Sequence, residues 1–312
     1  MRAIFWKEMA DHFGRRRFVL LFGLVVMGAV WGVLLDLDAI VRSGDGFFFL
    51  DMFTSDIAAG VPLSLLGFIS FFGPVIGIAL GFDSINSERT QGTLARVLAQ
   101  PVYRDAVFNG KFLAGLVTLS LVVLSMGIAV VGLGMFRIGV APGGDEVLRL
   151  IGFGSVTIAY LAFWLALAMT ASVFLRNTVT SALISIGLWI ALSFFVTLGA
   201  AVLADQLVPE VAAREATAEE ALRHFNIITW LSRLSPGALF SEAVGILLDP
   251  IGGRVLTLLS VAPERLEGLL ATPVSAGQSL QLVWPHIVVL VAMTGALAGL
   301  SYTKFMREEI RA

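Results

Sequence analysis

The sequence contains no cysteine and only three histidines, which lie far apart at positions 12, 224 and 286. Disulfides, a thiol nucleophile and a cysteine-ligated metal site are therefore excluded, and the histidines form no ligand cluster. Charged residues are scarce as well, at 14% of the chain, whereas about a quarter of a soluble domain is charged. Because 57% of the residues are hydrophobic, the composition predicts an integral membrane protein.

Motifs for catalysis and nucleotide binding are also missing from the sequence. It has no G-x-x-x-x-G-K-[ST] loop, no H-E-x-x-H and no G-x-S-x-G, and Gly110-Lys111 lacks an upstream glycine loop. We therefore expect a chain that is not an enzyme, has no metal or cofactor of its own and does not bind ATP by a P-loop. The net charge of -2 does not indicate nucleic acid as a partner.

Long apolar runs predict an all-α protein with six transmembrane helices, since about 20 apolar residues cross a bilayer core of ~30 Å. The predicted spans are residues 18–35, 61–82, 112–136, 150–175, 178–204 and 282–303. Most of the 21 lysines and arginines fall in the segments that this topology puts inside, including Arg15-Arg16-Arg17 before the first span. The positive-inside rule then predicts that both termini are cytoplasmic.

The segment 1–17 is predicted to be an interfacial elbow helix. Phe5, Trp6 and Met9 share one side of a helical wheel, and Lys7 and Glu8 lie opposite. Such a helix lies in the headgroup plane with its aromatic side towards the lipid. A soluble tail before a signal anchor is the alternative.

Residues 205–281 form the predicted outer helical region. Three helices are expected there: an alanine-rich one with a Thr217–Glu220 capping box, one from Pro236 to Leu248, and a short one over 263–270. On the same side, Phe47-Phe48-Phe49 is expected at the outer membrane surface, and His286 is expected to reach the interface.

The predicted spans hold no Asp, Glu, Lys or Arg at mid-depth, which disfavours an ion-coupled carrier. Hydroxyl groups could line a pathway for amphipathic cargo instead. The alternative is that they bond only to their own helix backbones. The candidates are Ser64, Ser70, Thr118, Ser125, Thr157, Tyr160, Thr170, Ser172 and Ser185.

The segment 83–111 is the longest polar stretch expected to face the cytoplasm. Gly92 can end a first helix, and Thr93 can cap a second one. Leu94, Val97 and Leu98 then form an apolar stripe, before Pro101 ends the second helix. The stripe needs a cover, which is either a partner protein or the chain's own helix ends and lipid headgroups.

This segment resembles the D…ER..GTL…PV.R….GK signature of ABC type-2 permeases, in particular the NosY-like branch. The signature is carried by Asp83, Glu88-Arg89, Gly92-Thr93-Leu94, Pro101-Val102, Arg104 and Gly110-Lys111. In that family the segment forms coupling helices that fit a groove of the nucleotide-binding subunit. The resemblance implies a coupling set of Asp83, Glu88, Arg89, Gly92, Thr93, Leu94, Val97, Leu98, Pro101, Arg104 and Lys111, with Glu88 as the polar anchor.

The resemblance implies a permease subunit of an ATP-driven exporter in the cytoplasmic membrane. ATP and Mg would be bound by a dimer of separate P-loop ATPase subunits, and a second permease, either an identical copy or a related chain, would complete the assembly. In NosY-like systems the permease serves maturation of a copper enzyme with an extracytoplasmic partner protein. The alternative function is a non-transporting membrane scaffold or signalling subunit that recruits a soluble protein.

Overall fold

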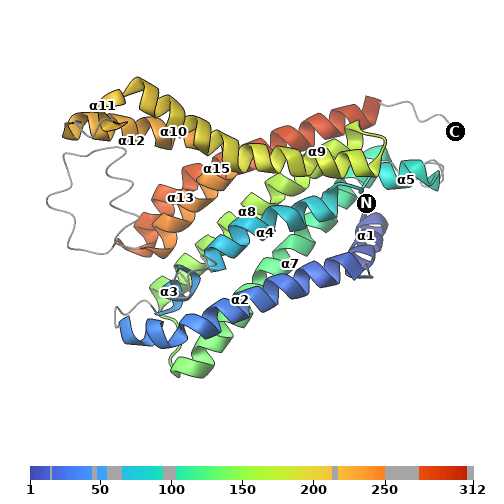
Figure 1. Ribbon diagram of the computed structural model, residues 1–312. Helices are drawn as coiled ribbons and strands as arrows, with labels where there is room; N and C mark the ends of the chain where they lie inside the picture. The colour runs from blue at the N-terminus through green and yellow to red at the C-terminus, as the bar shows by residue number, and fades with distance from the viewer. Residues whose placement is uncertain are drawn as a thin grey trace. The chain divides into compact units, whose positions relative to one another are not determined.

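A computed structural model of the chain (Figure 1) describes residues 1–14, 16–43, 48–54, 65–93, 103–212, 217–249 and 274–307. Within these ranges the regular elements are helices, and no strand is present. The chain divides into two compact units. The first consists of Met1–Pro142, Thr157–Gly187 and Val288–Ala312, and the second of Gly143–Val156 and Leu188–Ile287.

The first unit is built from helices, which satisfy their own backbone hydrogen bonds and so need no water in a lipid environment. Its complete helices are α1 (Arg2–Gly14), α2 (Arg16–Ser43), α3 (Phe48–Thr54), α4 (Leu65–Gly81), α5 (Asn86–Thr90) and α7 (Arg104–Ile138). It also holds parts of α8 (Gly144–Phe174), α9 (Thr178–Ile190) and α15 (Ala276–Arg307). Helix α2 packs on both α4 and α7, and α1 packs on α7.

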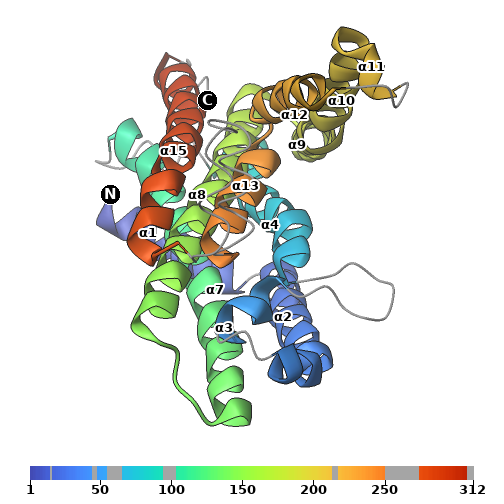
Figure 2. The same ribbon diagram turned by 90° about the vertical axis from the view of Figure 1, so that its left-hand side faces the viewer.

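The second unit contains the remaining parts of α8, α9 and α15 together with shorter elements. These are η1 (Ala191–Phe195), which is a π-helical turn, α10 (Val196–Leu207), α11 (Pro209–Ala212), α12 (Ala218–Ser232) and α13 (Pro236–Leu248). Helix α12 folds back beside α10, as Figures 1 and 2 show in gold. The capping box predicted at Thr217 and Glu220 is confirmed, and so is the start of α13 after Ser235. The helix predicted over 263–270 lies outside the described residues.

Five helical segments in the described part of the chain are long and apolar enough to cross a membrane. They are Leu65–Thr90, Arg104–Arg137, Gly144–Phe174, Thr178–Leu207 and Ala276–Arg307. The first predicted span, 18–35, falls within α2, where a shorter apolar stretch covers Phe18–Gly28. The six-span count therefore stays a prediction.

Several helices extend beyond their predicted spans. Helix α7 begins at Arg104 and not at 112, and α8 begins at Gly144 and not at 150. The hydropathy pattern marks only the apolar part of a helix. The helix itself continues through the polar residues at either end of that part. As a result Lys111 and Arg149, which were expected just outside the spans, lie on regular helical turns.

Two predictions about the outer side are wrong. Of the Phe47-Phe48-Phe49 motif, which was expected on the membrane surface, Phe47 lies outside the described residues, while Phe49 is buried in α3. A Cβ atom at Gly134 of α7 would lie only 3.0 Å from its ring, so α3 packs against α7. His286 was expected to reach the interface, yet it is buried with Nε2 3.3 Å from a Glu242 oxygen. In both cases tertiary packing covers side chains that the linear pattern assigns to the surface.

The hydroxyl groups of the spans either bond to their own helix backbones, as one alternative predicted, or link neighbouring helices; their role in a cargo pathway stays a prediction. Thr118, Ser125 and Ser185 donate to carbonyls of their own helices. Others link helices in the first unit: Tyr160 of α8 donates to the Ser70 carbonyl of α4, and Ser301 of α15 donates to Thr170 of α8. Ser64 lies outside the described residues.

Candidate functional site

The first unit brings four charged side chains together where α1, α5 and α7 meet. Lys7 and Glu8 come from the elbow helix α1, Glu88 from α5 in the predicted coupling segment, and Lys111 from the second turn of α7. We call Lys7, Glu8, Glu88 and Lys111 the charge cluster. It joins parts of the chain that are up to 103 residues apart.

Each ammonium of the charge cluster contacts both carboxylates. Lys111 Nζ donates to Glu8 Oε1 at 2.7 Å and to Glu88 Oε1 at 2.9 Å. Lys7 Nζ donates to the same two oxygens at 3.1 and 3.0 Å. The two positive and two negative groups therefore form a closed ring, with Asp11 near its edge at 3.6 Å from Lys7 Nζ.

The buried side of the ring is formed by Lys111 and Glu8, whose side chains are 4% and 6% exposed, whereas Lys7 is 53% exposed. Burial by itself raises the pKa of Glu8, but the positive charges and hydrogen bonds of Lys111 and Lys7 outweigh it and hold the pKa below its ordinary value. Burial likewise lowers the pKa of Lys7, and the attraction of Glu8 and Glu88 outweighs it and leaves that pKa raised. Both net pKa shifts favour the charged forms at neutral pH.

Helix α1 reaches this position because α7 has a glycine at the crossing. A Cβ atom at Gly110 would lie 3.0 Å from Ile4 Cγ2 and 3.2 Å from Ile4 Cβ, so a larger residue would push α1 away. One turn further along α1, Met9 is buried and its sulfur accepts a hydrogen bond from Thr118 at 3.3 Å. The sequence prediction had put Glu8 on the water-facing side of α1. This was wrong, because the side that packs on α7 carries Glu8, Met9 and His12.

The coupling segment is also attached to α8 on its other side. Ser172 Oγ accepts the backbone N–H groups of Ile85 and Asn86 at 3.0 and 3.1 Å. Arg89 donates to the Val173 carbonyl at 3.3 Å. The start of α5 is therefore fixed to α8, while Glu88 connects the same helix to α1 and α7.

The predicted coupling residues differ in their conformation, hydrogen bonds and burial. Gly92 has a φ of 67° and follows the end of α5, as expected for a glycine helix stop. Thr93 donates to the Glu88 carbonyl at 3.2 Å. Asp83 and Arg104 are half-buried, at the end of α4 and the start of α7. The stripe residues Leu94, Val97 and Leu98, and also Pro101, lie outside the described residues.

The predicted elbow residues Phe5 and Trp6 are half-buried and 60% exposed, respectively. Trp6 is thus exposed in this chain, and the interfacial position of α1 stays a prediction. Sequence reasoning did not identify Ser172 as a partner of the coupling segment, because a serine near the end of an apolar run carries no such signal. The sequence did indicate Lys111, but only as part of a family signature and not as the centre of an ion-pair ring.

Comparison with known proteins identifies the family of the chain. The family model described as ABC-2 family transporter protein matches residues 2–310. A protein of Stutzerimonas stutzeri named probable ABC transporter permease protein NosY is 28% identical over 190 residues, which cover 59% of this chain and 63% of that protein. A protein of the same name from Pseudomonas aeruginosa is 29% identical over 199 residues, which cover 62% and 65%. The chain thus spans less than two thirds of the length of either relative. The family model, in contrast, matches nearly all of this chain. The chain belongs to the ABC-2 family of transporter proteins.

Proposed function

We propose that this chain is the membrane permease subunit of an ABC transporter, and that separate P-loop ATPase subunits drive it through the segment 83–111. Family membership and the similarity to two NosY permeases support the general role. Because the sequence contains no P-loop motif, we propose that ATP and Mg bind to the partner. The complete transporter has two permease copies and two ATPase subunits, with both termini of the permease in the cytoplasm, six spans and export as the direction.

The observation that carries the proposal is the attachment of α5 to three other helices. Glu88 is paired with Lys7 of α1 and Lys111 of α7, and the start of α5 is held by Ser172 of α8. In this proposal a force applied to the segment that follows α5 is passed on to α1 and to two candidate spans. A scaffold that only recruits a soluble protein would not need such a rigid connection.

The role of Glu88 changes in this proposal. From the sequence it was expected to anchor the ATPase directly, but its Oε1 atom is already shared by Lys7 and Lys111. We infer that Glu88 transmits the motion inside the permease, while the apolar stripe Leu94, Val97 and Leu98 provides the contact with the ATPase.

Affinity purification in mild detergent tests the proposal. Wild type should bring down a P-loop ATPase, and Leu94→Asp should lose it, because the change puts a charge into an apolar contact. Arg223→Asp, at an exposed position of α12, is the matched control and should retain the ATPase. A wild-type preparation without any ATPase, in a detergent that keeps a related complex intact, would favour the scaffold function.

A further inference from the structure

Helix α4 contains a proline in its middle, and this removes one backbone hydrogen bond. Pro74 lies inside the helix Leu65–Gly81. Proline has no N–H group, so the carbonyl four residues earlier, that of Ser70, loses its helical partner. In a membrane such a carbonyl has no water to bind and needs a substitute donor.

The substitute donor comes from a neighbouring helix in the same unit. The hydroxyl of Tyr160 on α8 donates to the Ser70 carbonyl at 3.0 Å. Tyr160 is only 1% exposed, so water does not compete for this hydrogen bond. The two residues are 90 positions apart in the sequence, and the hydrogen bond connects α8 to the helical turn that Pro74 interrupts.

The inner half of α4, from Pro74 to the coupling segment, is held tightly on α8. A Cβ atom at Gly77 would lie 3.0 Å from the Leu161 carbonyl oxygen, and one at Gly81 would lie 2.8 Å from the Leu165 carbonyl oxygen. These distances leave no space for a side chain, so the two backbones are in direct contact. Together with the Ser172 hydrogen bonds described above, they make the inner half of α4 and α8 move as one body.

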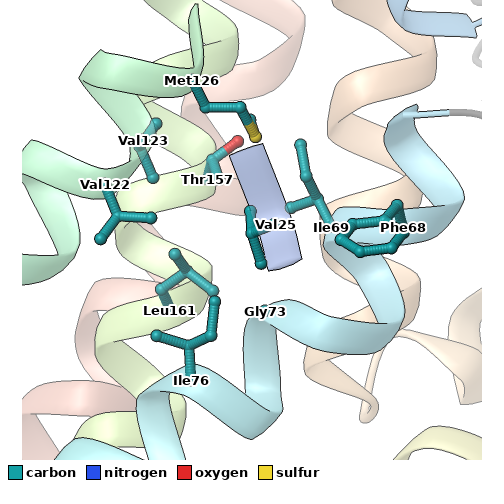
Figure 3. A pocket seen from close by; sticks show the side chains of 10 residues that line it. All are labelled: Val25, Phe68, Ile69, Gly73, Ile76, Val122, Val123, Met126, Thr157 and Leu161. Carbon is teal, nitrogen blue, oxygen red and sulfur yellow. The ribbon is translucent and has the colours of Figure 1, made fainter. Parts of the chain in front are cut away.

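A cavity of about 20 Å³ lies beside the middle of α4, on both sides of Pro74. Figure 3 shows the side chains around this cavity, with Gly73 at its edge. Its lining is apolar apart from Thr157, so a water molecule would find too few partners there. The lining includes Val25 of α2, Phe68, Ile69 and Gly73 of α4, Met126 of α7 and Thr157 of α8.

We propose that Gly73-Pro74 is a hinge between the two halves of α4 and that Tyr160 is the positioning residue that holds it in this conformation. The Tyr160–Ser70 hydrogen bond fixes the turn that Pro74 weakens, and the neighbouring cavity gives the outer half room to move when the bond opens. The use of the hinge in transport rests on the proposed function, because motion would enter α4 from the coupling segment. The hydrogen bond and the hinge themselves do not depend on that function.

A double-mutant cycle on the purified chain in lipid nanodiscs tests the proposal without an ATPase. Tyr160→Phe removes the donor, and we expect Tm to fall by about 2–4 °C. Pro74→Ala restores a backbone N–H for the Ser70 carbonyl, so Tyr160→Phe in that background should cause no fall in Tm. An equal fall in both backgrounds would overturn the proposal, because the hydroxyl would then be acting independently of the proline.

Distance measurements distinguish a hinge from a merely stabilising contact. The wild-type chain has no cysteine, so spin labels at Phe71→Cys and Gln91→Cys, on either side of Pro74, are unique. Tyr160→Phe should broaden the distance distribution, and Pro74→Ala should narrow it and abolish the effect of Tyr160→Phe. Superimposable distributions for wild type, Tyr160→Phe and Pro74→Ala would overturn the hinge. The double-mutant cycle and the distance measurements test the hinge and do not depend on whether an ATPase binds. The affinity purification tests the proposed function, so the two proposals can fail separately.

Discussion

The ammonium of Lys111 lies 2.7 Å from the carboxylate of Glu8, and both side chains are almost completely buried. This ion pair connects the elbow helix α1 to α7 across 103 positions of sequence. Glu88 of the coupling segment shares the same ammonium at 2.9 Å. A single lysine therefore joins α1, α5 and the candidate transmembrane span α7.

We expect Lys111→Met to destabilise the protein strongly. It leaves Glu8 buried with only the exposed Lys7 as a partner, and breaking a buried ion pair costs about 3–5 kcal/mol. Lys7→Met is the matched control, because an exposed pair contributes only about 0–1 kcal/mol. Thermal unfolding in the same detergent measures both, and similar losses for the two variants would contradict the central role of Lys111.

Gly110→Ala should weaken the docking of α1 on α7. The new Cβ atom would lie 3.0 Å from Ile4 Cγ2, and such overpacking costs about 1–3 kcal/mol. Gly127→Ala in the same helix meets no atom within 4 Å and should be neutral or slightly stabilising, since alanine favours helix over glycine. Oxidative cross-linking of Met9→Cys with Thr118→Cys reports the docking. If Gly110→Ala cross-links as efficiently as Gly127→Ala, the close approach at Gly110 does not matter.

The stability of the charge cluster should depend on pH at both ends of the scale. The pKa of Glu8 lies below its ordinary 4.5 in the folded protein, so its contribution is complete above pH 4.5 and is lost as the pH falls through the lowered value. The pKa of Lys7 lies above its ordinary 10.5, so its contribution is complete below pH 10.5 and is lost as the pH rises through the raised value. Tm measured against pH should show both losses.

Glu8→Gln provides the control for the acid limb, because glutamine does not titrate. The difference in Tm between wild type and Glu8→Gln should shrink as the pH falls below 4.5. Parallel curves over this range would show that Glu8 is not the responsible group.

As for Lys111 in the first unit, we expect that replacing the buried Arg149 destabilises the second unit. It is completely buried and donates to the carbonyls of Leu247 and Val274, to Ser279 Oγ and to Asp145. Arg149→Met would take this donor away from the carbonyls of Leu247 and Val274, and we expect a loss of about 3–5 kcal/mol. Asp145→Asn keeps an acceptor for the Ala276 N–H and should cost about 1 kcal/mol or less. Chemical denaturation in detergent compares the two variants, and equal costs would refute the prediction.

Thr217→Ala should loosen the start of α12 without affecting the rest of the protein. The Thr217 side chain accepts the Glu220 N–H, and the Glu220 carboxylate accepts the Thr217 N–H. Loss of such a cap costs about 0.5–2 kcal/mol. Hydrogen exchange of the first turn of α12 should accelerate accordingly, whereas Glu220→Gln, which preserves the capping pattern, should exchange nearly as in wild type. Unchanged protection in Thr217→Ala would mean that the cap does not stabilise the helix.

The sequence alone was sufficient for the features that depend on neighbouring residues. Apolar runs predicted the long helices, because a helix in lipid satisfies its own backbone and needs only length and hydrophobicity. The capping box at Thr217, the start of α13 after Ser235 and the turn at Gly92 were predicted for the same reason, since each depends on a few consecutive residues. The local signature of residues 83–111 predicted the family, whereas their coupling role stays a prediction.

Only the tertiary structure decided which distant side chains meet. Nothing in the linear pattern pairs Lys111 with Glu8, or Tyr160 with the Ser70 carbonyl, because these contacts depend on which helices pack together and at what rotation. The helical wheel of α1 put Glu8 towards water, since it treated the charge as solvated and could not include the lysine supplied by α7. A buried charge or an interrupted helical turn is stable only with a partner, and that partner comes from a remote part of the chain.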